Sequence, residues 1–203
     1  MSPVAKPAPD ETPNFDAAFR ARLKELFEWR RDVRRFRRDP VDGALIDEAI
    51  GLAALAPSVG FSQPWRFVKV DDPARRAAVR DNFRACNKEA LDDYHGERAK
   101  LYAGLKLAGL EEAPVQLAVF CDETTEAGRG LGRKTMPETL RYSVVTAVHT
   151  LWLAARARGL GVGWVSILDP EAIGGALDVP ADWRLVAYLC IGTPEEEHKD
   201  PEL

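Results

Sequence analysis

Arginines surround one carboxylate early in the chain: Arg30, Arg31 and Arg34 enclose Asp32. Each guanidinium presents a planar set of N–H donors that matches a phosphate, so several of them converging on one point predict a phosphate-binding site. The other interpretation is a solvated basic surface, because further arginines follow directly. Asp32 is either a base inside such a site or a counter-ion that relieves the repulsion between the arginines.

A second candidate is the loop of residues 56–65, Ala-Pro-Ser-Val-Gly-Phe-Ser-Gln-Pro-Trp. Ser58 supplies a hydroxyl, Gln63 a carboxamide and Trp65 an aromatic ring, on a backbone that prolines stiffen. These groups suit a flat heteroaromatic ligand with several donors and acceptors. The alternative is a plain helix-to-strand connection in which Trp65 fills the core.

A third candidate is the alternating glycine run of residues 159–166, Gly-Leu-Gly-Val-Gly-Trp-Val-Ser. A backbone without Cβ atoms allows a ligand to approach closely. The glycines precede an expected strand and do not link a strand to a helix, so they are weak support for a dinucleotide site. Taken alone, Ser166 is expected to be an ordinary strand serine.

Metal and disulfide chemistry are not indicated. His149 lies in an apolar helical segment without a partner at ligand spacing, so we expect a core histidine. The cysteines Cys86, Cys121 and Cys190 are odd in number and far apart, which predicts neither a disulfide framework nor a metal site.

The elements that must position these residues follow from hydrophobic periodicity and from helix and turn signals. Helices are expected at 15–29, 42–57, 137–158 and 170–179, and residues 74–111 are expected to be largely helical with breaks at glycines. Strands are expected at 66–70, 115–121, 161–168 and 183–192, and a polar loop at 122–136. Long helices alternating with few strands predict an α+β fold, a mixed central sheet surrounded by helices.

The composition and charge of the chain limit the number of domains and the classes of partner that we expect. Residues 15–203 are expected to form one domain after a disordered lead of residues 1–14, whose prolines and acidic residues do not resemble a secretory signal. A formal charge of -4 argues against a nucleic-acid partner. No apolar stretch approaches the ~20 residues of a membrane span, so we expect a cytoplasmic protein that does not bind membranes.

Taken in order, the arginine cluster, the Pro57-Ser58 to Gln63-Pro64-Trp65 loop, the long helix and the glycine run resemble the FMN-binding nitroreductase superfamily. Within it, the motifs are similar to those of the 5,6-dimethylbenzimidazole synthases. Those enzymes carry Asp in the arginine cluster, where ordinary nitroreductases carry Ser, and they carry Ser at the position of Ser166. Asp32 and Ser166 both fit this pattern.

This resemblance implies a homodimer that takes reduced FMN as its substrate and O2 as its co-substrate. It implies fragmentation of the flavin to 5,6-dimethylbenzimidazole, the lower ligand of cobalamin, and erythrose 4-phosphate, with a separate flavin reductase supplying reduced FMN. The alternatives are a conventional FMN-dependent NAD(P)H nitroreductase or dehalogenase-like oxidoreductase, and a non-catalytic flavin-binding protein.

The resemblance also implies a role for each site residue. Asp32 would transfer protons and Ser166 would orient the reacting ring. The phosphate would bind Arg30, Arg31, Arg34 and the backbone at Val33, and the flavin would be held by Ser58 and Gln63 of the neighbouring subunit. The remaining expected FMN contacts are Gly60, Leu105, Lys106, Gly163 and Trp164.

Overall fold

A computed structural model describes residues 13–93 and 107–200, with side chains left undescribed from 89 to 93. The sheet has four strands in the order β1 (Trp65–Lys69), β2 (Val115–Asp122), β4 (Trp183–Gly192) and β3 (Gly161–Val165). The helices are α1 (Ala17–Trp29), α2 (Gly43–Ala53), α3 (Pro73–Asp93), α5 (Thr139–Ala157) and α6 (Pro170–Ala176). Residues 107–112 are also helical, and single 3-10 turns, η2 and η3, cover Val59–Phe61 and Ala127–Gly130. The predicted α+β class is confirmed.

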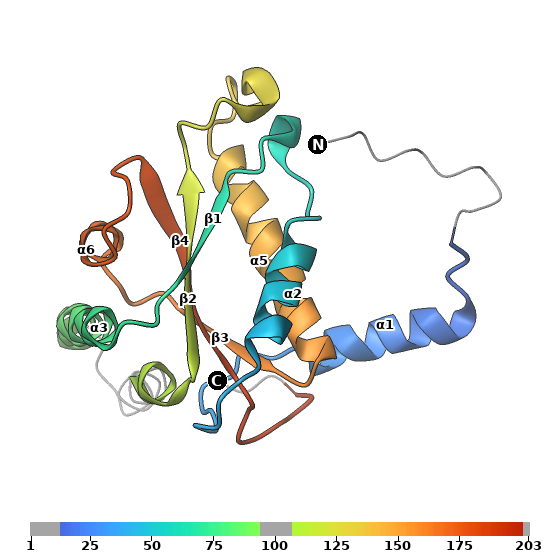
Figure 1. Ribbon diagram of the computed structural model, residues 1–203, viewed down its shortest axis with the longest axis horizontal. Coiled ribbons are helices and arrows are strands. Elements are labelled where there is room, and N and C mark those ends of the chain that lie inside the picture. The colour runs from blue at the N-terminus through green and yellow to red at the C-terminus, as the bar shows by residue number, and fades with distance from the viewer. Residues whose placement is uncertain (1–12, 94–106, 201–203) are drawn as a thin grey trace.

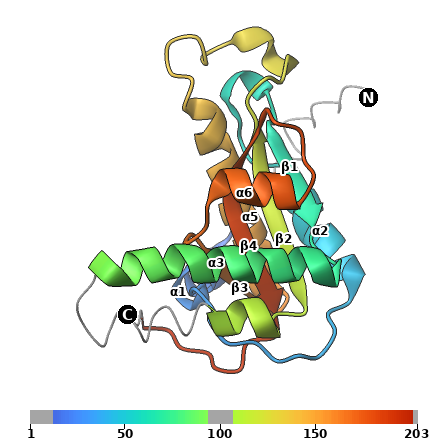
Figure 2. The same ribbon diagram turned by 90° about the vertical axis from the view of Figure 1, so that its left-hand side faces the viewer.

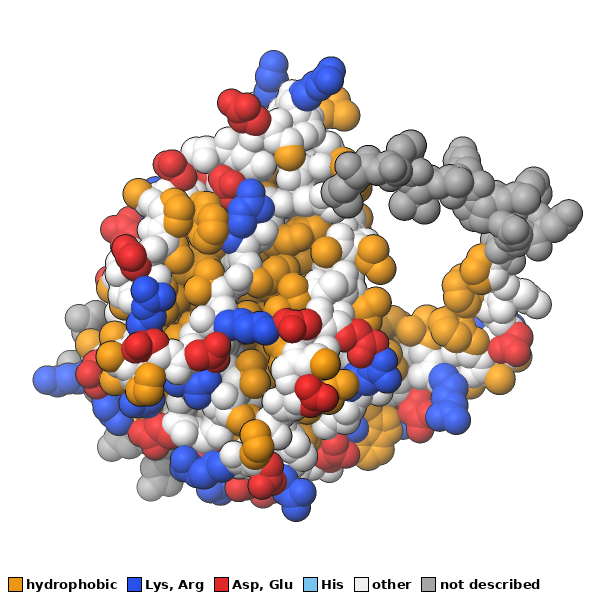
Figure 3. All heavy atoms as spheres, in the orientation of Figure 1, with side chains coloured by type: hydrophobic (Ala, Val, Ile, Leu, Met, Phe, Trp, Pro, Cys, Tyr) orange, Lys and Arg blue, Asp and Glu red, His pale blue; other side chains and the backbone are white. Residues whose placement is uncertain are grey.

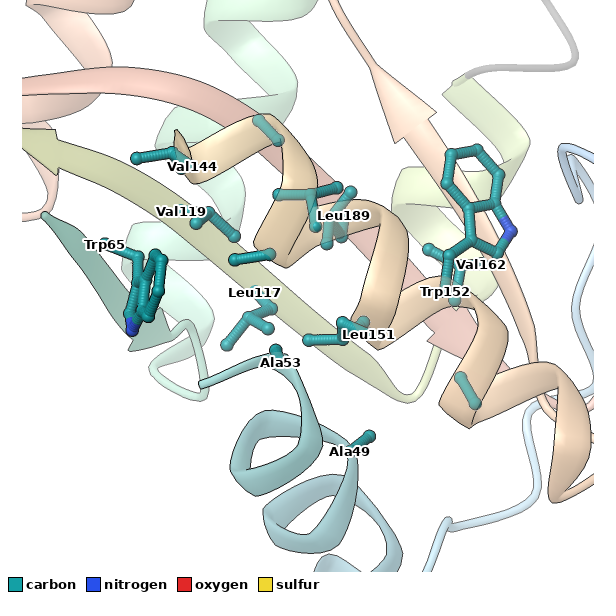
Figure 4. Close-up of a cluster of buried hydrophobic side chains, with 14 of the residues drawn as sticks. Ala49, Ala53, Trp65, Leu117, Val119, Val144, Leu151, Trp152, Val162 and Leu189 are labelled. Carbon is teal, nitrogen blue, oxygen red and sulfur yellow. The ribbon is translucent and has the colours of Figure 1, made fainter. Parts of the chain in front are cut away.

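The molecule has three layers, with α2 and α5 on one face of the sheet and α3 and α6 on the other (Figures 1 and 2). Strand β2 is buried on both faces because its side chains alternate between two cores. Leu117 and Val119 pack toward α5, and Ala118 and Phe120 pack toward α3 and α6. Figure 4 shows the first of these cores, between α2, α5 and the sheet. This burial explains the continuous apolar run from which a central strand was predicted.

The sheet corrects the prediction of mixed strand directions. Every pair of neighbouring strands is antiparallel: β1 with β2, β2 with β4, and β4 with β3. Helix α5 carries the chain across the sheet so that β2 and β3 point the same way. Strand β4 then inserts between them, so no two neighbouring strands of the described sheet are parallel. The parallel element in the described residues is an isolated bridge between Asp32 and Val162.

Three elements end earlier than predicted: α2 at Ala53, α6 at Ala176 and β3 at Val165. Strand β3 ends at Val165, so Ser166 is an exposed residue after the strand and not within it. The predicted loop of residues 122–136 contains the 3-10 turn η3.

Helix α5 has the predicted buried stripe, made of Leu140, Val144, Val148, Leu151 and Ala155. The expectation that His149 lies in the core is wrong, because His149 is on the exposed face of α5. Tyr142 and Val145 are exposed on the same helix, at 56% and 40%. The helix is therefore central to one core but leaves part of its surface uncovered within one chain.

Helix α1 begins at an Asp16 N-cap, whose carboxylate accepts a hydrogen bond from the Phe19 amide at 2.7 Å. The predicted helix is confirmed, but none of its residues is buried. It projects from the body of the fold, and apolar side chains are exposed along it (Figures 1 and 3). Phe19, Leu23 and Phe27 are 45%, 36% and 46% exposed. An amphipathic helix whose apolar stripe faces solvent in one chain lacks a packing partner.

Two features are absent from the described part of the chain. No helix among them is long and apolar enough to span a membrane. No group of three or more His, Cys, Asp or Glu side chains among them is placed to hold a metal ion.

The chain after α1 lies first against the edge of β3 and then against the segment after β4. The Val33 amide donates to the Val162 carbonyl at 3.0 Å, and the Arg37 amide donates to the Thr193 carbonyl at 2.9 Å. This approach requires Gly163, because a Cβ there would lie 2.1 Å from the Val33 carbonyl oxygen. A Cβ at Gly161 would lie 2.6 Å from a methyl group of Val33. The glycine run therefore serves close packing of the chain on itself.

We predict that Gly163→Ala displaces residues 32–34 from β3, because the obstructing atom is backbone and cannot rotate away. The loss of unfolding free energy should be at least about 3 kcal/mol, the upper part of the range for overpacking. Urea denaturation measures it. Gly175→Ala is the matched control, because its new Cβ meets nothing within 4 Å. Equal stability of the two variants would contradict the proposed contact.

Candidate functional site

Arg30, Arg31, Arg34, Trp152 and Arg156 line a cavity of about 340 Å³ between the end of α1, the end of α5 and the C-terminal segment. We call this cavity the arginine cleft. The arginines predicted to bind phosphate therefore face a shared space. Its volume lies within the usual range for small-molecule sites.

The end of α1 directs these side chains into the cleft. The Arg30 amide caps the helix by donating to the Leu26 carbonyl at 3.0 Å, and Arg30 itself has extended backbone angles. The Arg30 guanidinium then lies 5.1 Å from the centre of the Trp152 ring. Trp152 in turn packs against Trp164, with ring centroids 6.5 Å apart. The aromatic pair gives Arg30 a fixed surface to rest on.

Asp32 contacts both backbone and guanidinium. One carboxylate oxygen accepts a hydrogen bond from the Trp164 amide at 2.9 Å, and the other lies 3.7 Å from Nε of Arg34. The Asp32 side chain is 29% exposed and that of Arg34 is 18% exposed. The predicted counter-ion contact is thus present, together with a hydrogen bond to β3 that the sequence did not reveal. The role of Asp32 in proton transfer stays a prediction.

The structure places the glycine-run residues beside the cleft. Gly161 lines the cleft, and Gly163 lies under the Val33 carbonyl, so its expected contact with a flavin ring stays a prediction. Trp164 is half-buried against Trp152. Ser166 follows β3 on an exposed stretch.

The loop of residues 56–65 is held at the first half of α5. The Val59 amide donates to Oγ of Ser143 at 3.0 Å, and the Gln63 amide donates to Oγ of Ser58 at 3.1 Å. Gly60 has a φ of 55°, and a Cβ there would lie 2.5 Å from the Leu131 carbonyl oxygen. Trp65 is buried in the core, as the plainer interpretation of this loop proposed.

One chain does not bring the loop and the arginine cleft together. The loop contacts Ser143, whereas the cleft contains Trp152, which lies nine residues further along α5. At about 1.5 Å per residue these positions are about 14 Å apart along the helix. Leu105 and Lys106, also predicted to contact FMN, lie outside the described residues.

Sequence reasoning missed several cleft residues, among them Trp152 and Arg156 on α5. They are four residues apart on α5 and therefore share a helix face, which is the signal that could have found them. Arg156 donates to the Glu197 carboxylate at 2.5 Å and lies 5.8 Å from the centre of the Trp29 ring. The Arg156 guanidinium holds the pKa of Glu197 below its usual value.

We predict that Asp32→Ala leaves the Trp164 amide without the acceptor seen here, which should cost about 1–3 kcal/mol of unfolding free energy. Asp32→Asn keeps an oxygen acceptor at the same place and should cost clearly less. Urea denaturation compares the two variants, and hydrogen exchange reports on the Trp164 amide. Equal losses would show that this hydrogen bond does not hold residues 30–34 in place.

Comparison with known proteins identifies the family of this chain. The model of the nitroreductase family matches residues 27–193. The chain is 64% identical over 191 residues to a 5,6-dimethylbenzimidazole synthase of Rhodospirillum rubrum, covering 94% of this chain and 90% of that protein. It is 52% identical over 190 residues to a 5,6-dimethylbenzimidazole synthase of Rhodobacter capsulatus, covering 94% and 92%.

Among solved structures, iodotyrosine deiodinase bound to FMN and 3-iodo-L-tyrosine superposes with a TM-score of 0.74. The two sequences are 26% identical, and the match covers 89% of this chain and 95% of that one. The family model spans the loop of residues 56–65 and most of the arginine cleft, whereas the cleft residues after 193, such as Glu197, lie beyond it. This chain belongs to the nitroreductase family.

Proposed function

We propose that the protein is a 5,6-dimethylbenzimidazole synthase. It would fragment reduced FMN with O2 to 5,6-dimethylbenzimidazole, the lower ligand of cobalamin, and erythrose 4-phosphate. The observation that carries this proposal is the 64% identity to a protein of that name over almost the whole chain. The presence of Asp32 in the arginine cleft supports it further.

The donors of the arginine cleft fit FMN. Arg30, Arg31 and Arg34 offer charge-assisted hydrogen bonds to a phosphate. The Val33 amide donates to the Val162 carbonyl, so Val33 would position the arginines and would not itself donate to the phosphate. Trp164 and Gly163 on β3 would approach the flavin ring. The phosphate end of the ligand would thus be fixed by charge, and the ring end by the edge of the sheet.

Reduced FMN would supply the electrons and the carbon skeleton of the product, and O2 would be the oxidant. Asp32 would move protons at the junction of the ribityl chain and the ring. One of its oxygens is held by the Trp164 amide, so the other has a defined direction beside Arg34. A base positioned in this way commonly contributes about 10²–10⁴-fold to a rate. Ser166 would orient the ring.

A second copy of the chain would complete the site. Ser58, Gly60 and Gln63 lie at the opposite end of α5 from the arginine cleft, as the hydrogen bonds to Ser143 and the position of Trp152 indicate. The apolar surfaces of α1 and α5 are uncovered in one chain. A homodimer that covers both surfaces would bury more than the ~2,000 Å² at which obligate interfaces begin. It would also bring the loop of one subunit to the cleft of the other.

A separate flavin reductase would supply reduced FMN. The similarity to iodotyrosine deiodinase favours one alternative, an enzyme that keeps its flavin and reduces another substrate. Spectroscopy separates the two functions. Loss of flavin absorbance in air after reduction, with 5,6-dimethylbenzimidazole detected by mass spectrometry, supports the synthase. Retained yellow FMN that cycles with NAD(P)H supports the alternative.

We predict that Asp32→Asn binds reduced FMN and forms about 10²-fold less 5,6-dimethylbenzimidazole or lower still, because the amide cannot act as a base. Binding is measured by anaerobic titration, and product by mass spectrometry after incubation with a flavin reductase, NADH and air. Product formation at the unmodified rate would show that Asp32 is only a structural counter-ion.

The shared site is tested by mixing two impaired variants, Asp32→Asn and Gln63→Ala, after unfolding and refolding them together. In a mixed dimer one site carries both substitutions and the other carries neither. Equal mixing should therefore restore about a quarter of the unmodified activity, because half of the dimers are mixed. The control is each variant refolded alone. If mixing restores nothing, each site is built within one subunit.

A further inference from the structure

We infer that Arg156 is a further phosphate-binding residue of the arginine cleft, and that Glu197 occupies its guanidinium until the phosphate of the ligand displaces it. This inference rests on the proposed function, because it assumes that the phosphate of FMN binds in this cleft. It concerns a residue on α5 and a residue after β4, both distant in sequence from the arginine cluster.

Arg156 resembles the other cleft arginines in its burial and in its contact with an indole ring. Its side chain is 17% exposed and lines the same cavity as Arg30 and Arg31. Two of these guanidiniums lie over indoles: Arg30 over Trp152 at 5.1 Å, and Arg156 over Trp29 at 5.8 Å. An indole occupies the face of a guanidinium and leaves its in-plane N–H groups available for an anion. Both arginines are thus held in position before a ligand arrives.

The segment after β4 lies across the cleft and pairs with several of its cations. Glu197 accepts from Arg156 at 2.5 Å, and the Lys199 carbonyl accepts from Nε of Arg31 at 2.7 Å. Lys199 is itself 2.8 Å from the Glu28 carboxylate on α1. The Glu197 carboxylate therefore provides Arg156 with the kind of oxygen contact that a phosphate would provide.

This pair is suited to exchange. The Glu197 side chain is 45% exposed, and ion pairs at such positions contribute little to stability. A phosphate monoester carries up to two negative charges at neutral pH and offers three acceptor oxygens, which a single carboxylate cannot match. The phosphate is therefore the better partner for Arg156, and Glu197 can leave toward solvent.

The experiment measures the dissociation constants of oxidised FMN and riboflavin for the full chain, by quenching of flavin fluorescence. The variants are Arg156→Gln and Glu197→Gln, with Arg31→Ala as a reference for loss of a phosphate contact. Arg158 and Glu48 offer a matched control, because they form an ion pair at the same end of α5 and do not line the cleft. Arg158→Gln and Glu48→Gln should leave both flavins unaffected.

Arg156→Gln should weaken FMN binding roughly tenfold or more, the loss of a charged hydrogen bond, and leave riboflavin binding unchanged. Glu197→Gln should strengthen FMN binding roughly two- to fivefold, because no exposed ion pair has to be broken. Equal effects of Arg156→Gln on both flavins, or no effect on either, would show that Arg156 only supports the fold. Weaker FMN binding by Glu197→Gln would show that Glu197 is a support and does not compete with phosphate.

The same binding experiment distinguishes failure of the proposed phosphate anchor from failure of the role of Arg156 alone. If the unmodified protein binds FMN and riboflavin equally, no phosphate contact exists in the cleft, and both the proposed anchor and the role of Arg156 are wrong. If the unmodified protein and Arg31→Ala differ as expected while Arg156→Gln behaves like Arg158→Gln, the anchor stands and only the role of Arg156 is wrong.

Discussion

The site depends on one backbone contact, the docking of residues 32–34 on the edge of β3. The Val33 amide bonds to the Val162 carbonyl, Asp32 accepts from the Trp164 amide, and Gly163 leaves room for the Val33 carbonyl. Fixing this backbone fixes the directions of the flanking arginines, which line the same cleft. A phosphate site on a helix end alone would lack this support.

Concentrating arginines in one cleft is costly, since like charges close together repel one another. The fold offsets this repulsion with carboxylates from two segments: Asp32 lies beside Arg34, and the segment after β4 places Glu195 beside Arg35 and Glu197 beside Arg156. Indole rings add a second kind of contact without adding charge. The cleft is therefore partly neutralised without a ligand, and arginines still outnumber carboxylates among the residues that line it. A bound phosphate can take the place of a carboxylate without leaving uncompensated charge.

The apolar surfaces left uncovered in one chain and the separation of the predicted site into two parts both favour a second copy of the chain. Helix α1 buries none of its residues, and α5 exposes Tyr142 and Val145 while its opposite face forms the core. The loop with Ser58 and Gln63 and the arginine cleft meet different halves of α5. A second copy that covers these surfaces would bury their apolar side chains away from water. The same dimer would complete the site.

The sequence by itself determined the helices, the strands, the arginine cluster and the family resemblance, because these depend on local periodicity and on short motifs. The antiparallel sheet was decided only in three dimensions, where β4 inserts between β2 and β3. The requirement for glycine at position 163 was also decided only in three dimensions, because the atom that a Cβ would meet belongs to Val33, which is distant in sequence. Arg156 and Glu197 were invisible as site residues, since an arginine on a helix and a glutamate near a terminus resemble ordinary surface residues until packing places them in the arginine cleft.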